Sequence, residues 1–331
     1  MKIPKKRLII IILFIILILS MIFSLGIGRG RFQILDLLSF LHPQSLSPSE
    51  KTILFEIRMP RLILSVLVGA ALSLSGAVLQ GLFQNPLVDP YVLGISSGGA
   101  VGAIVAILSG FSVGFITLPL FSFLFALATT FLVLRLGQIG HKMPLEIMLL
   151  AGVAIGFFFS ALISLGMFLA GENLHQMVFW IMGGFWNSSW QKVYVILPLF
   201  LIGFPLIFSY SRELNTFLLG EKVAESIGVE VEKTKKILLF ITSLLVASSV
   251  SVSGVIGFVG LVVPHIIRII IGEDHRHLLP ASLLLGSSVL LWADIFSRTL
   301  LHPVELPVGV LTSLMGAPFF IYLLRRKKKG W

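Results

Sequence analysis

Ten apolar stretches, separated by short polar segments, run along the 331-residue chain. The first, Leu8 to Ile27, has 20 residues, and at about 1.5 Å per residue it reaches roughly 30 Å, the thickness of the hydrocarbon core of a bilayer. Helices satisfy their backbone hydrogen bonds internally, as a chain inside a bilayer must. We therefore predict an all-α, polytopic membrane protein with about ten transmembrane helices. The other nine predicted spans are Leu62 to Phe83, Tyr91 to Ser109, Phe111 to Leu134, Ile147 to Ala170, Val193 to Ser209, Ile237 to Ser253, Val255 to Ile271, Leu278 to Phe296 and Leu306 to Leu324.

Basic residues precede the first stretch, so a cleaved signal peptide is the alternative to a retained helix. The hydrophobic region of a signal peptide has about 7–15 residues and ends in a small-residue cleavage site. The stretch that follows Arg7 is longer and has no such site. We expect it to remain as the first span.

The composition excludes several classes of protein. Hydrophobic residues make up 56% of the chain and charged residues 12%, with a net charge of +10, and a soluble protein carries roughly twice that charged fraction. The basic residues occur in short runs between apolar stretches, which does not favour nucleic-acid binding. The absence of cysteine excludes disulfides and cysteine-ligated metals.

The distribution of Lys and Arg predicts the orientation of the spans, because cytoplasmic loops are enriched in these residues. If both termini are inside, the inner segments hold 18 of the 25 Lys and Arg residues and the outer segments hold 7. The predicted orientation therefore has both termini in the cytoplasm, which requires an even number of spans.

An internal repeat occurs at an offset of 178 residues. The matches are Ser73 to Gly76 with Ser251 to Gly254, Pro86 with Pro264, and Gly94 with Gly272. The offset leads from the second span to the seventh, and a shift by an odd number of spans reverses the direction through the membrane. The pattern predicts an inverted repeat within a single transmembrane domain, residues 1–331, with approximate halves 1–190 and 191–331.

Small residues recur at every fourth position in the second, third, fifth and tenth spans, which keeps them on one helix face. Examples are Gly69 and Ser73 in the second span and Gly98 and Gly102 in the third. Such ridges let helix backbones approach closely. We predict a closely packed helical bundle.

Two segments outside the spans are long enough to form structure of their own. The inner stretch 212–236 contains Val223 and Ile227, four positions apart, and predicts a short amphipathic helix with Gly228 as its C-terminal cap. A solvated connector is the alternative. The outer stretch from Gly171 to Lys192 carries three tryptophans and predicts a short interfacial helix or an aromatic membrane anchor.

The chain shows little chemistry of its own. It has neither a Gly-x-x-x-x-Gly-Lys-Ser/Thr phosphate-binding loop nor a His-Glu-x-x-His metal motif. Gly94 to Gly98 matches the Gly-x-Ser-x-Gly nucleophile pattern, so an intramembrane hydrolase using Ser96 is one alternative. Ionisable residues are nearly absent from the spans, which disfavours a second alternative, an ion-coupled secondary transporter. We expect the energy for any transport to come from a partner.

A series of short motifs, in order along nearly the whole chain, resembles one family. They are Arg58-Met59-Pro60-Arg61, Gly69 to Ala77, Asn85-Pro86-Leu87, Leu93-Gly94, Gly257 to His265, Asp274-His275-Arg276, Leu279-Pro280, Ala293-Asp294, Glu305 to Gly309 and Gly316-Ala317-Pro318. The chain resembles the iron-siderophore, haem and vitamin B12 permease family of type II ATP-binding-cassette (ABC) importers.

This resemblance implies a homodimeric permease, multi-pass in a prokaryotic cytoplasmic membrane, with two cytoplasmic ATPase subunits and an extracytoplasmic substrate-binding protein. ATP and Mg would bind to the ATPase subunits, and no cofactor to this chain. An iron-siderophore chelate is the expected substrate, with haem and cobalamin as alternatives.

The resemblance also implies roles for particular residues. The helix that couples the permease to the ATPase would contain Gly220, Glu221, Ala224, Ile227 and Gly228. The inner gate would contain Asn85, Leu87, Pro144 and Leu145, although the loop near Pro144 lacks the small polar residues that we associate with the family. Arg58, Arg61 and Arg298 would receive acidic residues of the binding protein, and the path would be lined by Gly152, Gly156, Ser160, Gly309 and Ser313.

Overall fold

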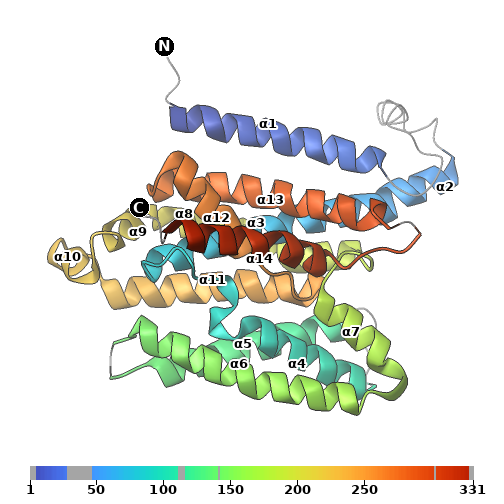
Figure 1. Cartoon of the computed structure of the whole chain (residues 1–331), viewed down its shortest axis with the longest axis horizontal. Coiled ribbons are helices and arrows are strands. Elements are labelled where there is room, and N and C mark those ends of the chain that lie inside the picture. Colours follow the sequence, from blue (N-terminus) through green and yellow to red (C-terminus); the bar gives the residue numbers. More distant parts are fainter. Residues whose placement is uncertain (1–4, 28–46, 111–115, 141, 302, 328–331) are drawn as a thin grey trace.

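The computed structural model describes residues 5–27, 47–110, 116–140, 142–301 and 303–327. These residues form a bundle of roughly parallel and antiparallel helices (Figure 1). Apart from one isolated β-bridge, between Ile139 and Lys142, the described residues contain only helices, turns and loops. The prediction of an all-α membrane protein is confirmed.

Each predicted span coincides with a helix. Among the residues that the structure describes, seven helices are long and apolar enough to cross a membrane, and three further apolar helices are shorter over their apolar part. The long ones are α1 (Lys5–Gly26), α3 (Met59–Leu82, continuous with the preceding turns), α5 (Thr117–Gly137), α6 (Leu145–Phe168), α8 (Trp190–Ser209), α11 (Val231–Ser253) and α13 (His275–Thr299). The three others are α4 (Ile95–Leu108), α12 (Val259–Ile271) and α14 (Val308–Lys327, whose apolar part spans Val308–Tyr322).

The predicted start of the fourth span, Phe111, lies outside the residues that the structure describes, within which α5 begins at Thr117. Another predicted start is wrong. We placed the start of the seventh at Ile237, whereas α11 begins two turns earlier, at Val231. The extra turns carry Glu232 and Lys235, whose charges interrupted the apolar pattern in the sequence.

Short helices lie between the spans. Before α3 come α2 (Pro48–Lys51) and the π-helical turn η3 (Thr52–Arg58), and before α4 comes η4 (Pro90–Leu93). Between α6 and α8 lie η6 (Gly171–Asn173) and α7 (Leu174–Met182), where an outer helix was predicted. Between α8 and α11 lie α9 (Ser211–Phe217) and α10 (Glu221–Ser226).

Helix α3 is the centre of the bundle, and it contacts α8, α11, α12 and α13. Glycine makes these contacts close. A methyl group added at Gly69 would lie 2.4 Å from the carbonyl oxygen of Gly286 in α13, and one at Gly76 would lie 1.8 Å from that of Gly260 in α12. The small-residue ridge of α3 is therefore a packing surface.

The helix contacts of the two halves correspond to each other. In order along the chain, α3, α4, α5 and α6 of the first half correspond to α11, α12, α13 and α14 of the second. In the first half α4 contacts α5 and α6, and in the second half α12 contacts α13 and α14. The contacts between the halves correspond as well: α3 contacts α12 and α13, and its counterpart α11 contacts α4 and α5. Two structurally related halves produce this pattern. The half boundaries at 190 and 191 stay a prediction.

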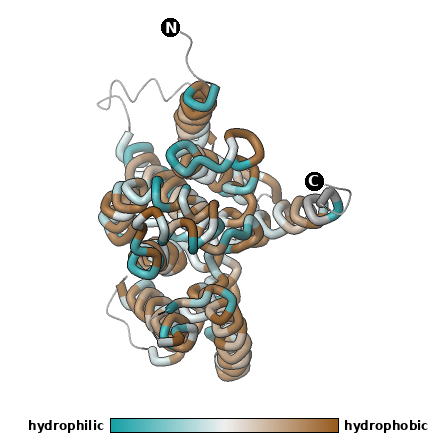
Figure 2. Tube along the Cα trace, turned by 90° about the vertical axis from the view of Figure 1, so that its left-hand side faces the viewer, coloured by the Kyte–Doolittle hydropathy of each residue, from teal (hydrophilic) through white to brown (hydrophobic). Residues whose placement is uncertain are grey.

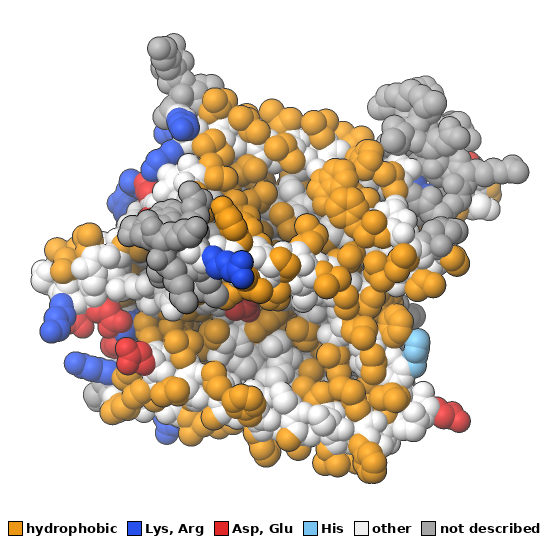
Figure 3. Space-filling view, viewed as in Figure 1, with side chains coloured by type: hydrophobic (Ala, Val, Ile, Leu, Met, Phe, Trp, Pro, Cys, Tyr) orange, Lys and Arg blue, Asp and Glu red, His pale blue; other side chains and the backbone are white. Residues whose placement is uncertain are grey.

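One end of the bundle carries both ends of the described chain. Helix α1 begins and α14 ends at the end that also holds α9 and α10, whereas α2 and α7 lie towards the opposite end (Figure 1). On the face in Figure 3, most of the Lys and Arg side chains gather towards the α9 and α10 end. On the same face, apolar side chains cover much of the surface between the two ends (Figure 3), and hydrophobic residues predominate along most of the helices (Figure 2).

The contact at Gly76 gives a test of the packing. We expect Gly76→Leu to abolish folding, because overpacking alone costs about 1–3 kcal/mol and the obstacle here is a backbone carbonyl that cannot move aside. The control is Gly156→Ala in α6, where an added methyl group meets nothing within 4 Å. Thermal unfolding in detergent, followed by size-exclusion chromatography, measures both. Equal stability of the two variants would contradict this account of the core.

Candidate functional site

The short helix α10 stands out from the basic end of the bundle (Figure 1). Its boundaries come from two glycines with left-handed backbone conformations, Gly220 at φ 101° and Gly228 at φ 90°. The N–H of Gly228 donates to the carbonyl of Glu225, and the N–H of Val229 donates to that of Ala224. This hydrogen-bond pair is a Schellman motif, so the prediction of Gly228 as a C-terminal cap is confirmed.

Two faces of α10 differ in exposure. Ala224 is completely buried against its own chain, whereas Val223 and Ile227 are 43% and 60% exposed. Leu219, just before the helix, is exposed as well. An apolar patch in an aqueous loop marks an interaction surface. Of the predicted coupling residues, Ile227 lies on this patch and Ala224 lies behind it, and the sequence analysis missed Leu219.

A buried lysine lies beneath α10. The Lys235 side chain, in the first turns of α11, is only 2% exposed. Its ammonium nitrogen lies 2.7 Å from a carboxylate oxygen of Glu221 in α10 and 3.3 Å from one of Glu232. The other oxygen of Glu232 accepts a hydrogen bond from the backbone N–H of Met143, at 2.9 Å. The sequence analysis did not identify Lys235, because the sequence does not show how α10 folds back over the first turns of α11 and buries this side chain.

The two predicted parts of the inner gate occupy separate loops. Asn85 and Leu87 form one turn, in which the Asn85 side-chain oxygen accepts from the Leu87 N–H at 3.0 Å. Just before it, Gln84 has a left-handed backbone, and its side-chain amide donates to the Phe217 carbonyl of α9 at 2.7 Å. Pro144 and Leu145 form the start of α6. Their role as a gate stays a prediction.

A further contact joins α9 to α13. The Asn215 amide donates to Asp274 at 2.8 Å and its oxygen accepts from the backbone N–H of His275 at 2.8 Å. Asp274 caps α13, and its hydrogen bonds with Arg276 hold the pKa of its carboxyl well below the usual range. The α9 and α10 segment is therefore tied to the bundle at several points.

The predicted path residues fall into two groups. Gly152 and Gly309 pack inside the subunit, because a methyl group at Gly152 would lie 2.0 Å from the Val92 carbonyl and one at Gly309 would lie 2.3 Å from that of Met182. We correct our prediction for these two: they are packing positions. Gly156 and Ser160 lie on the open side of α6, and Ser313 is half-buried in α14. For these three the path role stays a prediction.

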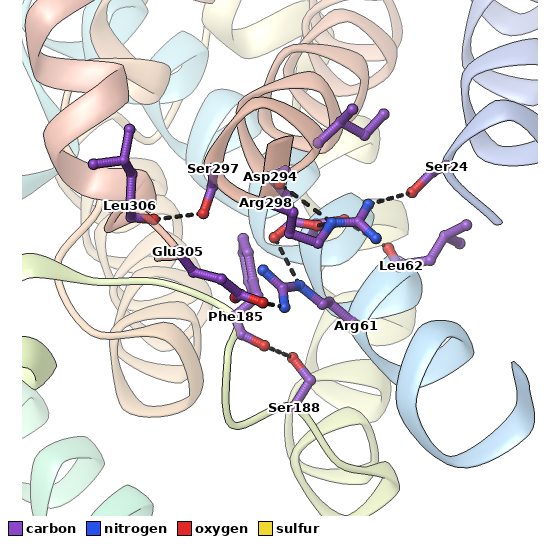
Figure 4. A network of polar contacts seen from close by, with 12 residues as sticks. Ser24, Arg61, Leu62, Phe185, Ser188, Asp294, Ser297, Arg298, Glu305 and Leu306 are labelled. Atoms are coloured by element: carbon purple, nitrogen blue, oxygen red, sulfur yellow. Dashed lines mark hydrogen bonds and ion pairs between the residues drawn. The ribbon is translucent and has the colours of Figure 1, made fainter. Parts of the chain in front are cut away.

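At the opposite end, a buried network joins α1, α3, α13 and the loop before α14 (Figure 4). The guanidinium of Arg61 bonds to Asp294 and to Glu305, both at 2.9 Å. Arg298 bonds to Asp294 at 3.2 Å and to Ser24 of α1 at 3.1 Å. The Ser297 hydroxyl donates to the Leu306 carbonyl. Within this network, two guanidinium groups are paired with two carboxylates. The pairing offsets the cost of removing these charges from water.

Docking of a partner at the outer arginines would need accessible guanidinium groups, but two of them are buried in the subunit. Arg58 and Arg61 are 5% and 8% exposed, and Arg58 donates to the Leu25 carbonyl at the end of α1. The carboxylates of Asp294 and Glu305 occupy positions at which we expected acids of a partner. Docking at these arginines stays a prediction.

The predicted aromatic belt has a second role. Trp180 and Trp186 line a cavity of about 530 Å³ beneath α7, together with His175 and Lys192. The Trp190 indole donates to the Phe55 carbonyl in η3 at 2.9 Å. These side chains are therefore more than lipid anchors.

The alternative activities gain no support from the geometry. Gly94 caps the start of α4 and Gly98 packs against Thr129, so the Gly-x-Ser-x-Gly segment is a helix start. In the described part of the chain, no three His, Cys, Asp or Glu residues are grouped as a metal site.

Comparison with known proteins decides the family. Residues 16–326 match the model of the FecCD transport family. The chain belongs to this family. It is a membrane-spanning permease of the ABC-importer type.

Related permeases are named for different substrates. The chain is 47% identical to an uncharacterized ABC transporter permease, YvrB, of Bacillus subtilis, over 86% of this chain and 81% of the relative. It is 43% identical to a cobalamin import system permease of Halobacterium salinarum, over 82% and 73%. It is 36% identical to a molybdate import system permease of Haemophilus influenzae, over 94% of both.

A solved structure supports the fold. A metal-chelate type ABC transporter in an inward-facing conformation superposes with a TM-score of 0.86 at 35% identity, covering 97% of this chain and 99% of that one. The similarity covers nearly the whole permease.

The outer network makes a testable prediction about stability. We expect Arg61→Met to lower the free energy of unfolding by about 3–5 kcal/mol, because it leaves two carboxylates, Asp294 and Glu305, with only one cation, Arg298. The double variant Arg61→Met with Asp294→Asn leaves one cation, Arg298, and one carboxylate, Glu305, and should regain much of that loss. Unfolding in detergent measures both variants. A double variant less stable than the single one would contradict the charge balance.

Proposed function

We propose that this chain is the permease subunit of an importer that moves a metal chelate into the cytoplasm, driven by separate ATPase subunits. The observation that carries the proposal is the apolar patch of Leu219, Val223 and Ile227 at the basic end of the bundle. The chain has no nucleotide-binding loop of its own. A partner that hydrolyses ATP therefore has a docking surface here, with the α9 and α10 end in the cytoplasm.

A second copy of the permease would complete the path. The open side of α6 carries exposed apolar residues such as Val153 and Phe157, and α14 carries Leu314 and Met315. In a homodimer, these two helices from each copy would face one another across the substrate path. Gly156, Ser160 and Ser313 are then the small residues of its wall.

At the outer end, a substrate-binding protein would deliver the chelate. The loop before α14 carries Glu305, which bonds to Arg61 of α3. A docked protein that presents carboxylates of its own would compete with Glu305 for this guanidinium. Outer docking and the position of α14 would then be linked.

Transport needs no covalent chemistry. ATP binding would bring the ATPase subunits together and move α10, and the packed halves would rock to open the path to one side and then the other. The closely packed α3 core suits rigid-body movement. Tight binding of the chelate would belong to the binding protein, so that the path can release its cargo.

The substrate that we propose is a ferric siderophore, with haem and cobalamin as alternatives. The named functions of relatives span cobalamin and molybdate, so the choice rests on a transport assay. Proteoliposomes containing the permease, its ATPase and the binding protein are offered a ferric siderophore, haemin, cobalamin and molybdate. ATP-dependent uptake of the ferric siderophore alone supports the proposal. Uptake of one of the other compounds instead would contradict it and identify that compound as the substrate.

We predict that alkaline phosphatase fused after Lys327 is inactive, whereas the same enzyme inserted after Val304 is active. The physical reason is the excess of Lys and Arg at the α9 and α10 end. Phosphatase activity in intact cells measures the side of each fusion. An active fusion after Lys327 would reverse the proposed orientation.

We expect Ile227→Asp to disrupt binding of the ATPase subunits and to abolish ATP-dependent uptake, because it places a charge in the apolar patch. The permease should remain folded, since Ile227 is 60% exposed. Co-purification of the ATPase with tagged permease is the measurement. Lys222→Ser, on the same helix, is the control. Normal ATPase binding by Ile227→Asp would reject α10 as the docking helix.

A further inference from the structure

The contacts of Lys235 form a continuous chain between α10 and the loop that begins α6. Glu221 of α10 bonds to Lys235, Lys235 bonds to Glu232, and Glu232 accepts from the N–H of Met143. Met143 directly precedes Pro144 and Leu145, with which α6 starts. Four groups from three segments thus meet at the first turns of α11.

Burial makes this chain of contacts different from a surface ion pair. Removing an ammonium group from water is costly, and only close opposite charges compensate. Lys235 has two of them, and its side chain is 2% exposed. A nearby pair, Lys233 with Glu230, has the same spacing of three residues but side chains that are 66% and 67% exposed. Pairs of the exposed kind contribute little.

The positions of the groups favour joint movement. Glu232 and Lys235 are three residues apart and share one face of α11. Through this face α11 holds α10 on one side and the Met143 loop on the other. A displacement of α10 is therefore passed to the start of α6, a helix of the proposed path wall.

The other gate loop has a connection of its own. The Gln84 amide donates to the Phe217 carbonyl of α9, three residues before Gly220. Both inner loops are thus joined to the segment that carries α10, through different contacts. The Lys235 contacts serve the loop before α6.

We propose that Lys235 is a positioning residue that transmits movement of α10 to the Met143–Leu145 loop through Glu221 and Glu232. This inference rests on the proposed function, in which α10 docks on the ATPase. It adds Lys235, Glu221 and Glu232 as the link between ATP hydrolysis and the inner gate.

The test uses the complete complex with its ATPase subunits in lipid nanodiscs. The chain contains no cysteine, so a spin label attaches only at an introduced cysteine. One labelled variant is Lys222→Cys, on α10, and the other is Lys142→Cys, beside the gate loop. The spectrum of each label is recorded without nucleotide and with ATP and vanadate, in the otherwise native chain and with Glu221→Gln. This substitution removes the negative charge from the contact with α10 and leaves Lys235 paired with Glu232.

In the native chain we expect both labels to respond to ATP and vanadate. With Glu221→Gln, the label on α10 should still respond, and the response at residue 142 should fall by up to about tenfold, since the amide oxygen of Gln accepts from an ammonium group more weakly than a carboxylate does. The ATP hydrolysed per molecule transported should rise correspondingly. A purely structural role would lower the yield of folded complex and leave this ratio unchanged.

The control is Glu230→Gln, which removes the exposed pair and should change neither label nor ratio. If Glu221→Gln leaves the response at residue 142 and the transport ratio unchanged, the proposed transmission is wrong. A label on α10 that is silent in the native chain would instead contradict the docking role of α10, and the transmission with it.

Discussion

The close approach of helix backbones at the glycines of α3 is the contact on which the rest of this structure depends. At Gly69 and Gly76 the carbonyl groups of α13 and α12 occupy the space that a side chain would need. Lipid supplies no hydrophobic force between helices, so such van der Waals contacts hold a membrane bundle together. They also make the subunit stiff, and a stiff body is what rocking between two access states requires.

Two clusters of ion pairs lie at opposite ends of this body. At the outer end, Arg61 and Arg298 are balanced by Asp294 and Glu305. At the inner end, Lys235 is balanced by Glu221 and Glu232. Each cluster joins a helix to a loop: the outer one holds the loop before α14 and the inner one holds the loop before α6. These polar contacts are therefore found where partners are proposed to dock, with the apolar core between them.

Length and hydropathy were sufficient to predict the spans, because the bilayer sets both. The cap at Gly228 was also predictable, since it follows from a local pattern. The burial of Arg61 was not, because its partner Asp294 is 233 positions away in the chain. Lys235 was missed because its charge and that of Glu232 interrupt the apolar pattern, which also hid the start of α11. The roles of Gly152 and Gly309 were misjudged because a small-residue stripe does not reveal which neighbour it faces.

The central claim is that the apolar patch on α10 binds an ATPase subunit in the cytoplasm. Photo-crosslinking in intact cells tests it most directly, with a photoreactive amino acid in place of Ile227 and, as control, in place of Val304 in the loop at the opposite end. The account predicts a covalent product between permease and ATPase from position 227 and none from position 304. A product with the ATPase from position 304, or none from position 227, would contradict it.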